Sequence, residues 1–319
     1  MSRPSPNRRR LNRFARRGLE AIFWITFALA VAIGGPGALE GLPGLSDLMV
    51  PSPFLEAQAS GQTGQIATVP IVAVAPPAPA ESARPMRRLP AVAIVIDDMG
   101  SELVQNRRAI ALPRAVSLSF LPDPPNTAML AREARAAGHE ILAHVPMQAG
   151  TNEGLSAMAL RIDLSPEENV RRLDWALMRV RGYAGINNHE GSVFTADRQA
   201  LAGVAQALYG RGIYFLDSRT TPASQVVAVS RAFGVPSATR DIFLDDDETP
   251  QAIANQLRLL ERDARTSGVA IAIGHPHPLT LDALARWCRY HPGIRVVPVS
   301  VAIRLKTERE IGVKVASSD

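Results

Sequence analysis

From residue 90 onward, short apolar runs rich in β-branched residues alternate with stretches whose apolar residues recur at helical spacing. The apolar runs predict eight strands: Val92–Ile96, Val116–Phe120, Glu140–His144, Ala184–Asn187, Ile213–Leu216, Ala238–Phe243, Val269–Ile273 and Ile294–Val299. The intervening amphipathic stretches predict helices, among them Asn126–Ala137, Asp197–Tyr209, Pro250–Thr266 and Leu281–Tyr290. Strands that alternate with helices are joined by right-handed crossovers, so the pattern predicts a largely parallel sheet.

The number of strand–helix units favours a β/α barrel. Residues 90–305 hold about eight of these units, and a closed β/α barrel needs 200 or more residues. An open doubly wound sheet is the alternative, but no glycine-rich phosphate loop follows the first strand. Asp97-Asp98-Met99-Gly100 stands there instead. We therefore expect an α/β barrel with about seven to eight parallel strands.

The first 89 residues have a different pattern. Residues 1–18 contain seven arginines and no acidic residue, and residues 19–39 are almost entirely apolar. A cationic arm followed by an apolar segment is typical of membrane insertion with the arm in the cytoplasm, so residues 19–39 are predicted to be a membrane anchor or a cleaved signal peptide. Residues 40–89, rich in Pro, Ala and Gly, predict a disordered linker.

This organisation places the chemistry in residues 90–305, with residues 306–319 as a C-terminal tail. The folded domain is expected to face the periplasm, either anchored to the inner membrane or released there after cleavage.

The charge balance supports this division. Lys and Arg number 35 against 30 Asp and Glu, which gives a net charge of +5 and a pI near 9.9. Without the seven arginines of the arm, 28 basic residues remain against the same 30 acidic ones. The basic character therefore belongs to the arm, and we expect it to meet a membrane and not a nucleic acid. A single cysteine, Cys288, excludes an internal disulfide and a zinc site built from cysteines.

Polar residues gather at the C-terminal ends of the predicted strands, where a parallel β/α barrel carries its active site. These residues are Asp97, Asp98, His144, Asn187, Asn188, His189, Asp217, Ser218, Arg219, His275 and His277. Carboxylate and imidazole ligands without thiols suit zinc or another divalent transition metal. Two adjacent carboxylates also permit one to bind the metal while the other takes a proton.

Five stretches in order resemble the divergent polysaccharide deacetylase family: Ala93–Gly100, Gly138–Met147, Gly185–Ser192, Phe215–Thr220 and Ile273–Pro276. The resemblance covers roughly residues 90–305. It implies kinship with the metal-dependent polysaccharide deacetylases and hence a distorted or incomplete β/α barrel. It also implies that Asp97 is the catalytic base, Asp98 and His144 are metal ligands, and His275 is the general acid.

One departure from the family pattern concerns the metal. The related deacetylases carry a second metal-binding histidine four residues after the first, and that position here is Gln148. His189, at the end of another strand, is the natural replacement, which gives the ligand set Asp98, His144 and His189 and leaves one position open. Arg219 is expected to orient Asp97 or to bind an anionic substrate group.

Three further candidates for binding or orienting the substrate are Asn188, Asp217 and Gln148. The acidic run Asp245–Glu248 precedes a predicted helix, so we interpret it as a helix cap and a solvated loop, with a second cation site there as the alternative.

Two functions from different classes fit these features. The first is an envelope hydrolase that uses a divalent metal, zinc by preference, to remove N-acetyl or related acyl groups from peptidoglycan or another N-acetylated polysaccharide. The second is a non-catalytic envelope protein that binds a glycan or a membrane partner on the same barrel. A metal-dependent phosphoesterase is disfavoured because no basic cluster lies among the strand-end motifs.

Overall fold

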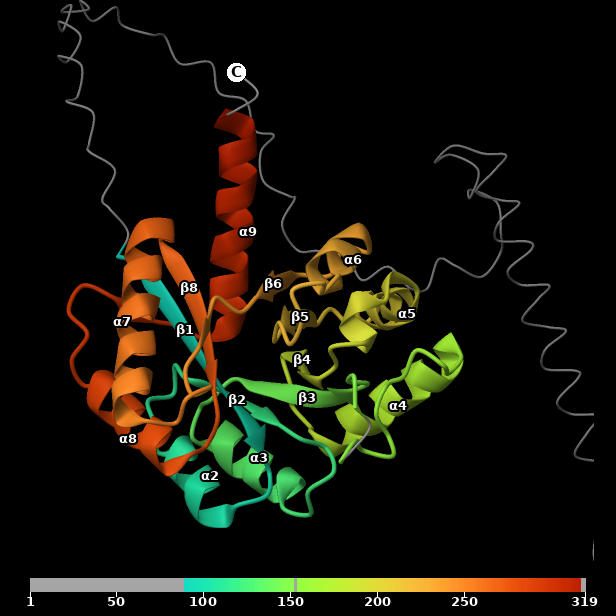
Figure 1. The fold of residues 1–319 in the computed structure, drawn as a ribbon, viewed down its shortest axis with the longest axis horizontal. Helices are drawn as coiled ribbons and strands as arrows, with labels where there is room; N and C mark the ends of the chain where they lie inside the picture. Colours follow the sequence, from blue (N-terminus) through green and yellow to red (C-terminus); the bar gives the residue numbers. More distant parts are fainter. Residues whose placement is uncertain (1–88, 152–153, 317–319) are drawn as a thin grey trace, which may run out of the picture. The chain divides into compact units, whose positions relative to one another are not determined.

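The computed structural model describes residues 89–151 and 154–316 (Figure 1). The predicted arm and membrane segment, and all but the last residue of the predicted linker, lie outside the described residues. Among the helices of the described part, none is both long and apolar enough to cross a bilayer.

The described residues form one nine-stranded sheet in which every strand pair is parallel, as predicted. The strands are β1 (Ala91–Met99), β2 (Ser117–Phe120), β3 (Ile141–Met147), β4 (Gly185–Glu190), β5 (Tyr214–Asp217), β6 (Ser237–Thr239), β7 (Ile242–Phe243), β8 (Val269–Gly274) and β9 (Arg295–Val296). The helices are α2 (Leu103–Ile110), α3 (Thr127–Ala136), α4 (Pro166–Arg179), the 3-10 turn η2 (Phe194–Ala196), α5 (Arg198–Tyr209), α6 (Val226–Ala232), α7 (Pro250–Ser267), α8 (Pro278–Trp287) and α9 (Val299–Ala316).

The sheet is an incomplete barrel. Its strand order is β6-β5-β4-β3-β2-β1-β8-β7, so β6 and β7 are the two edges. Only Arg240 and Asp241 separate these edge strands along the chain, and such a link spans at most about 11 Å. The two edges must therefore lie close together, with no ladder of hydrogen bonds across the seam. The prediction of one continuous strand over Ala238–Phe243 is wrong, because the chain steps there from one edge of the sheet to the other.

The last predicted strand, Ile294–Val299, is also shorter than expected. β9 pairs only with the first residues of β1, at Ala91 and Val92, because β2 occupies the same side of β1 from Val95 onward. The chain then enters α9, which runs through the domain boundary predicted at residue 305.

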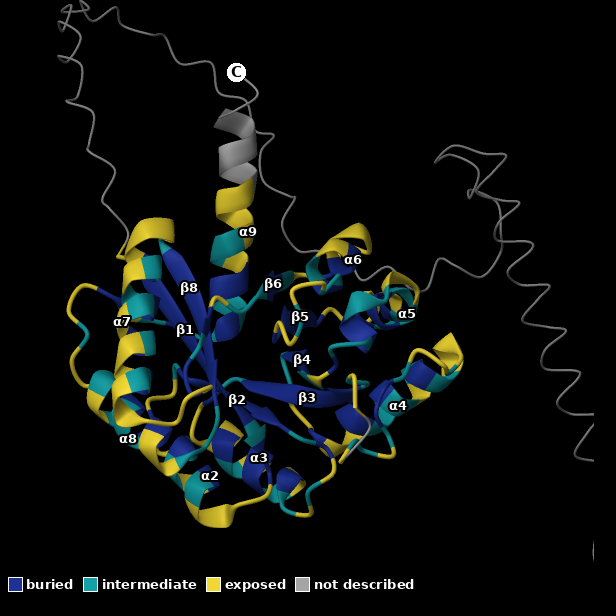
Figure 2. Ribbon diagram, in the orientation of Figure 1, coloured by how far each residue is buried: buried dark blue, intermediate teal, exposed yellow. Residues whose placement is uncertain are grey.

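Side chains alternate between two apolar cores, as strand geometry requires. Along β1, Ala91, Ala93 and Val95 belong to the core inside the barrel, whereas Val92, Ile94 and Ile96 face the surrounding helices. The start of α9 adds Val299, Ala302 and Ile303 to the inner core and closes the N-terminal end of the barrel. Figure 2 shows the buried strands and the helices with one buried and one exposed face. The opposite, C-terminal ends of the strands remain for the polar residues.

Candidate metal and catalytic site

Because side chains alternate between the two faces of each strand, most of the polar candidates point to the inside of the barrel. Asp97 in β1, His144 in β3 and His275 directly after β8 each follow an inner-core residue two positions earlier, namely Val95, Leu142 and Ile273. In the same way Asn187 and His189 are two residues apart on β4, and Asn187 lies beside His144 in the register between β3 and β4.

Asp98 is the exception, because a residue adjacent to Asp97 should point to the other face of the sheet. The backbone of Asp98 is left-handed, with φ of 54°, and the pairing of β1 with β2 is irregular between Ile96 and Met99. This local distortion brings both neighbouring carboxylates into the same cavity.

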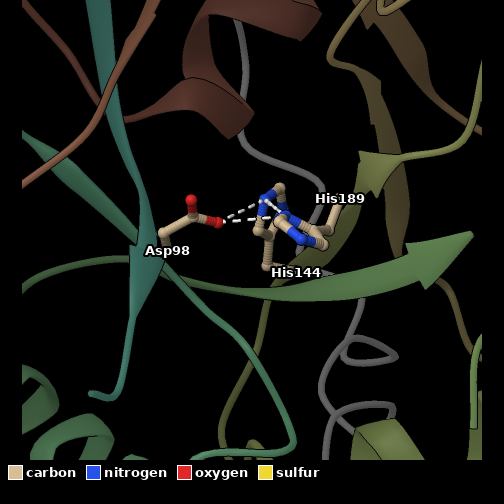
Figure 3. Close-up of side chains that lie close together, drawn as sticks. All are labelled: Asp98, His144 and His189. Carbon is tan, nitrogen blue, oxygen red and sulfur yellow. Dashed lines mark hydrogen bonds and ion pairs between the residues drawn. The ribbon is translucent and has the colours of Figure 1, made fainter. Parts of the chain in front are cut away.

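Asp98, His144 and His189 converge on one point from β1, β3 and β4 (Figure 3). Oδ1 of Asp98 lies 3.2 Å from Nε2 of His144 and 3.0 Å from Nδ1 of His189, and the two nitrogens are 3.2 Å apart. Zinc bonds of about 2.0–2.1 Å in tetrahedral geometry space the ligand atoms about 3.3 Å apart. The three side chains that were predicted as ligands therefore lie together at the spacing such an ion needs.

The chemistry of the polar groups in this cluster fits a cation. Oδ1 of Asp98 is buried and accepts no hydrogen bond from the described residues. Burial acts to raise the pKa of Asp98, but the imidazoles of His144 and His189 more than offset it and hold the pKa far below its ordinary value. A carboxylate whose buried oxygen faces two imidazole nitrogens fits a divalent metal, since each of these groups has a lone pair to donate.

Asn187 orients the side chains of His144 and Asp97 through hydrogen bonds. Its Nδ2 donates to both carboxylate oxygens of Asp97 at 2.9 Å and to Oγ of Ser218 at 3.1 Å. Its Oδ1 accepts from Oγ of Ser119 at 2.6 Å and faces Nδ1 of His144 at 2.9 Å. Because the amide nitrogen must face the carboxylate, Nδ1 of His144 carries the proton and Nε2 presents its lone pair to the cluster.

Asp97 is buried and lies beside the proposed ligands, with Oδ2 3.7 Å from Nε2 of His144. Burial raises the pKa of Asp97 above its ordinary value, and this effect outweighs the lowering by His144 and His275. A carboxylate with a raised pKa is better suited to accept a proton near neutral pH than an ordinary one.

On the other side of the cavity, His275 is held by Asp245. The backbone N–H of His275 donates to Oδ2 of Asp245 at 2.7 Å, and its Nδ1 lies 3.0 Å from Oδ1. Thr280 also donates to Oδ2, at 2.8 Å. Burial alone would lower the pKa of His275, but Asp245, Asp97 and Asp98 raise it to about 9. The free Nε2 of His275 lies 3.9 Å from Oδ2 of Asp98 and faces the cluster.

Two of the other predicted candidates line the cavity and two do not. Asn188 and Arg219 are lining residues. The side-chain amide of Asn188 is already hydrogen-bonded, because its Nδ2 donates to the carbonyl oxygen of Glu190 and its Oδ1 accepts from the N–H of Ser218. Asp217 lies behind the wall, where its Oδ1 accepts from the N–H of Arg219 at 2.8 Å. Gln148 lies outside the lining, and its Oε1 accepts from the N–H of Ile162 at 2.9 Å. The side chain of Gln148 thus stabilises the loop around Leu160 and Ile162, which pairs with the end of β3.

Sequence reasoning missed three residues of the site: Asn187 as the central bridge, Asp245 and Arg240. The spacing of two between Asn187 and His189 on a strand was a usable signal for the first. The interpretation of Asp245–Glu248 as a cap and solvated loop is wrong for Asp245, which is buried. The cap of α7 is Thr249, which accepts from the N–H of Ala252. Arg240 was hidden inside a predicted continuous strand.

The cavity has a volume of about 410 Å³. Three non-glycine residues of the described chain have left-handed backbones, namely Asp98, Glu190 and Arg219, with φ between 52° and 54°. All three line this cavity. Strained backbone of this kind is concentrated at functional sites, because the surrounding structure must hold it in place.

Comparisons with known proteins identify the family of this chain. Residues 94–303 match the sequence model of the divergent polysaccharide deacetylases. The uncharacterized protein YibQ of Escherichia coli (strain K12) is 38% identical over 193 residues, 60% of this chain and 60% of that protein. An uncharacterized protein of Haemophilus influenzae is 36% identical over 201 residues, 63% of this chain and 72% of that protein. This chain therefore spans about three fifths of the length of the Escherichia coli relative.

A solved structure shares the fold. The uncharacterized protein ATU2773 from Agrobacterium tumefaciens C58 superposes with a TM-score of 0.65 and 29% identity, over 69% of this chain and 91% of that protein. Since the family match covers well over half of the chain, as its motifs predicted, the protein belongs to the divergent polysaccharide deacetylase family.

Proposed function

We propose that this protein is a metal-dependent hydrolase of the cell envelope that removes N-acetyl or related acyl groups from a polysaccharide. The observation that carries the proposal is the convergence of Asp98, His144 and His189 on one point, flanked by the buried carboxylate of Asp97 and the imidazole of His275. Membership of the family supports the class of reaction.

Asp98, His144 and His189 would hold the cation, for which we propose zinc. A divalent ion bound there polarises the acyl carbonyl and lowers the pKa of water. The preset tautomer of His144 lets its Nε2 bind without rearrangement.

The chain's own acid and base stand on either side of this cluster. Asp97, oriented by Asn187, takes a proton from the attacking water as its oxygen adds to the acyl carbon. His275, whose pKa is raised by the hydrogen bond and charge of Asp245, donates from Nε2 to the leaving amine as the C–N bond breaks. The products are a carboxylic acid and a glycan with a free amino group. Asp245 holds Nδ1 of His275 and so keeps Nε2 directed at the reaction.

The test measures bound metal and acetate release on the purified full-length protein, with an N-acetylglucosamine oligomer as substrate. We expect about one metal ion per chain and acetate release, and the variants Asp98→Ala and His144→Ala should lose both. His291→Gln removes a histidine outside the cavity and is the control. Acetate release that persists in both ligand variants would refute the assignment. Tight metal binding without release from any N-acetylated glycan would favour a glycan-binding protein.

We also propose that the domain works outside the cytoplasm, at the inner membrane or free in the periplasm. The support is the arginine-rich arm and apolar segment of residues 1–39. A reporter enzyme that is active only outside the cytoplasm, fused to the C-terminus, should be active in cells. An inactive but stable fusion would contradict this location.

A further inference from the structure

Two arginines line the cavity that holds the proposed metal ligands. Arg219 follows β5, and Arg240 lies in the link between β6 and β7. The two are 21 residues apart in sequence, and the incomplete barrel brings them together: Nη2 of Arg240 donates to the carbonyl oxygen of Arg219 at 3.3 Å. Two arginines therefore line the cavity, whereas the sequence motifs included only Arg219.

The turn that carries Arg219 is held from two sides. The carboxylate of Asp217 accepts from the N–H of Arg219 at 2.8 Å, and Nε of Arg240 donates to the carbonyl oxygen of Ser218 at 2.8 Å. These bonds hold Arg219 at φ of 53°, a conformation that glycine adopts without strain. Arg219 therefore has a conformation that is unfavourable for a residue with a side chain, at a position that lines the cavity.

Neither guanidinium forms an ion pair within the described part of the chain. Among the described residues, no carboxylate lies within 4.0 Å of the side-chain nitrogens of Arg219 or Arg240. Burial lowers the pKa of Arg240, and the positive charge of Arg219 adds to the lowering, whereas Asp97, Asp217 and Asp246 oppose it from farther away.

Arg240 is also stacked and only partly used as a donor. Its guanidinium carbon lies 4.4 Å from the centre of the Phe243 ring. Two of its nitrogens donate to backbone carbonyls, which leaves at least three of its five N–H groups without a partner in the described chain. A rigid, oriented fork with free donors is suited to bind a planar oxyanion.

We propose that Arg219 and Arg240 form a subsite for an oxyanion group, carboxylate or phosphate, on the saccharide whose acyl group is removed. This inference rests on the proposed function and narrows its substrate class to acidic glycans. The anionic group joins both guanidinium groups, relieves their mutual repulsion, and places the neighbouring N-acyl group beside Asp97 and Asp98.

The test compares three probes by calorimetric titration of the zinc-loaded full-length protein. They are a neutral N-acetylglucosamine tetramer, the disaccharide N-acetylglucosaminyl-N-acetylmuramic acid with its carboxylate, and N-acetylglucosamine 6-phosphate. At least one acidic probe should bind about ten-fold or more tightly than the neutral one, and the tighter of the two identifies the anion. Arg219→Gly and Arg240→Gln should each lower the affinity for the acidic probe by about 10-fold or more and so remove most of this preference, as expected for the loss of a charge-assisted hydrogen bond.

Two controls separate binding from structure. Arg262→Gln removes an equal charge from α7, outside the cavity lining, and should keep the preference. Arg219→Gly should melt no lower than the wild type, because glycine relieves the left-handed backbone. A purely structural Arg219 would instead lower the melting temperature.

The outcomes distinguish this inference from the proposed function, with acetate release measured on the same samples. Equal affinity for neutral and acidic probes, or a preference that survives in both arginine variants, overturns the subsite even when acetate is released. An arginine-dependent preference without acetate release from any probe supports the subsite and overturns the hydrolase.

Discussion

Replacing Asn187 should weaken zinc binding at the proposed metal site and perturb Asp97. Asn187→Ala removes the acceptor of Nδ1 of His144 and both hydrogen bonds to the carboxylate of Asp97. A group that orients a metal-binding histidine typically contributes 10- to 100-fold in metal affinity. Each hydrogen bond to a charged group contributes about 1.5–3 kcal/mol. Zinc affinity should therefore fall by about 10- to 100-fold, and the pKa of Asp97, already raised by burial, should rise further.

Zinc competition against a chromogenic chelator measures the first effect, and the acid limb of the pH profile of acetate release measures the second. Asn187→Asp is the matched comparison, because it keeps an acceptor for His144 but sets a second carboxylate against Asp97. We expect it to retain more of the zinc affinity than Asn187→Ala while its acid limb moves to higher pH. Wild-type zinc affinity in Asn187→Ala would refute the bridging role of this side chain.

Three further predictions concern single contacts. In metal-free protein the raised pKa of His275 adds to the free energy of unfolding. This contribution is fully present below about pH 6.5 and declines by about 3 kcal/mol as the pH rises through 9. Urea titrations at a series of pH values should show this decline, and Asp245→Asn should remove most of it. Gln148→His should fail to restore zinc binding to His189→Ala, because the side chain of residue 148 faces the N–H of Ile162; recovered affinity would show that this loop adapts. Gly185→Ala should destabilise the fold by about 1–3 kcal/mol, because the new methyl group would meet the ring of Tyr214 at 2.4 Å; an unchanged midpoint of denaturation would contradict the tight packing.

The sequence was sufficient where a local repeat decides the structure. Alternation along a strand, combined with the rule that active sites lie at the C-terminal ends of barrel strands, placed Asp97, His144, His189 and His275 in the cavity. The metal-binding and catalytic roles of these residues stay predictions, but their proximity follows from pattern alone.

Features that depend on contacts distant in sequence could not be predicted. The bond from Asp245 to His275 joins residues 30 apart, and an acidic run before a helix has the same local pattern whether it caps the helix or enters a cavity. The break between β6 and β7 arises because the chain passes there from one edge of the incomplete barrel to the other, which no local propensity encodes. Arg240 enters the cavity only as a result of that break.

The three residues with left-handed backbone conformation limit how the sequence of this protein can evolve. Holding Asp98, Glu190 and Arg219 in that conformation costs about 1 kcal/mol or more each, a sizeable part of a typical stability of about 5–15 kcal/mol. Directed evolution for heat resistance alone should therefore replace these residues by glycine early. Selection for activity on a glycan should restore them. The same three positions would thus be the ones at which thermal tolerance and chemistry compete most directly.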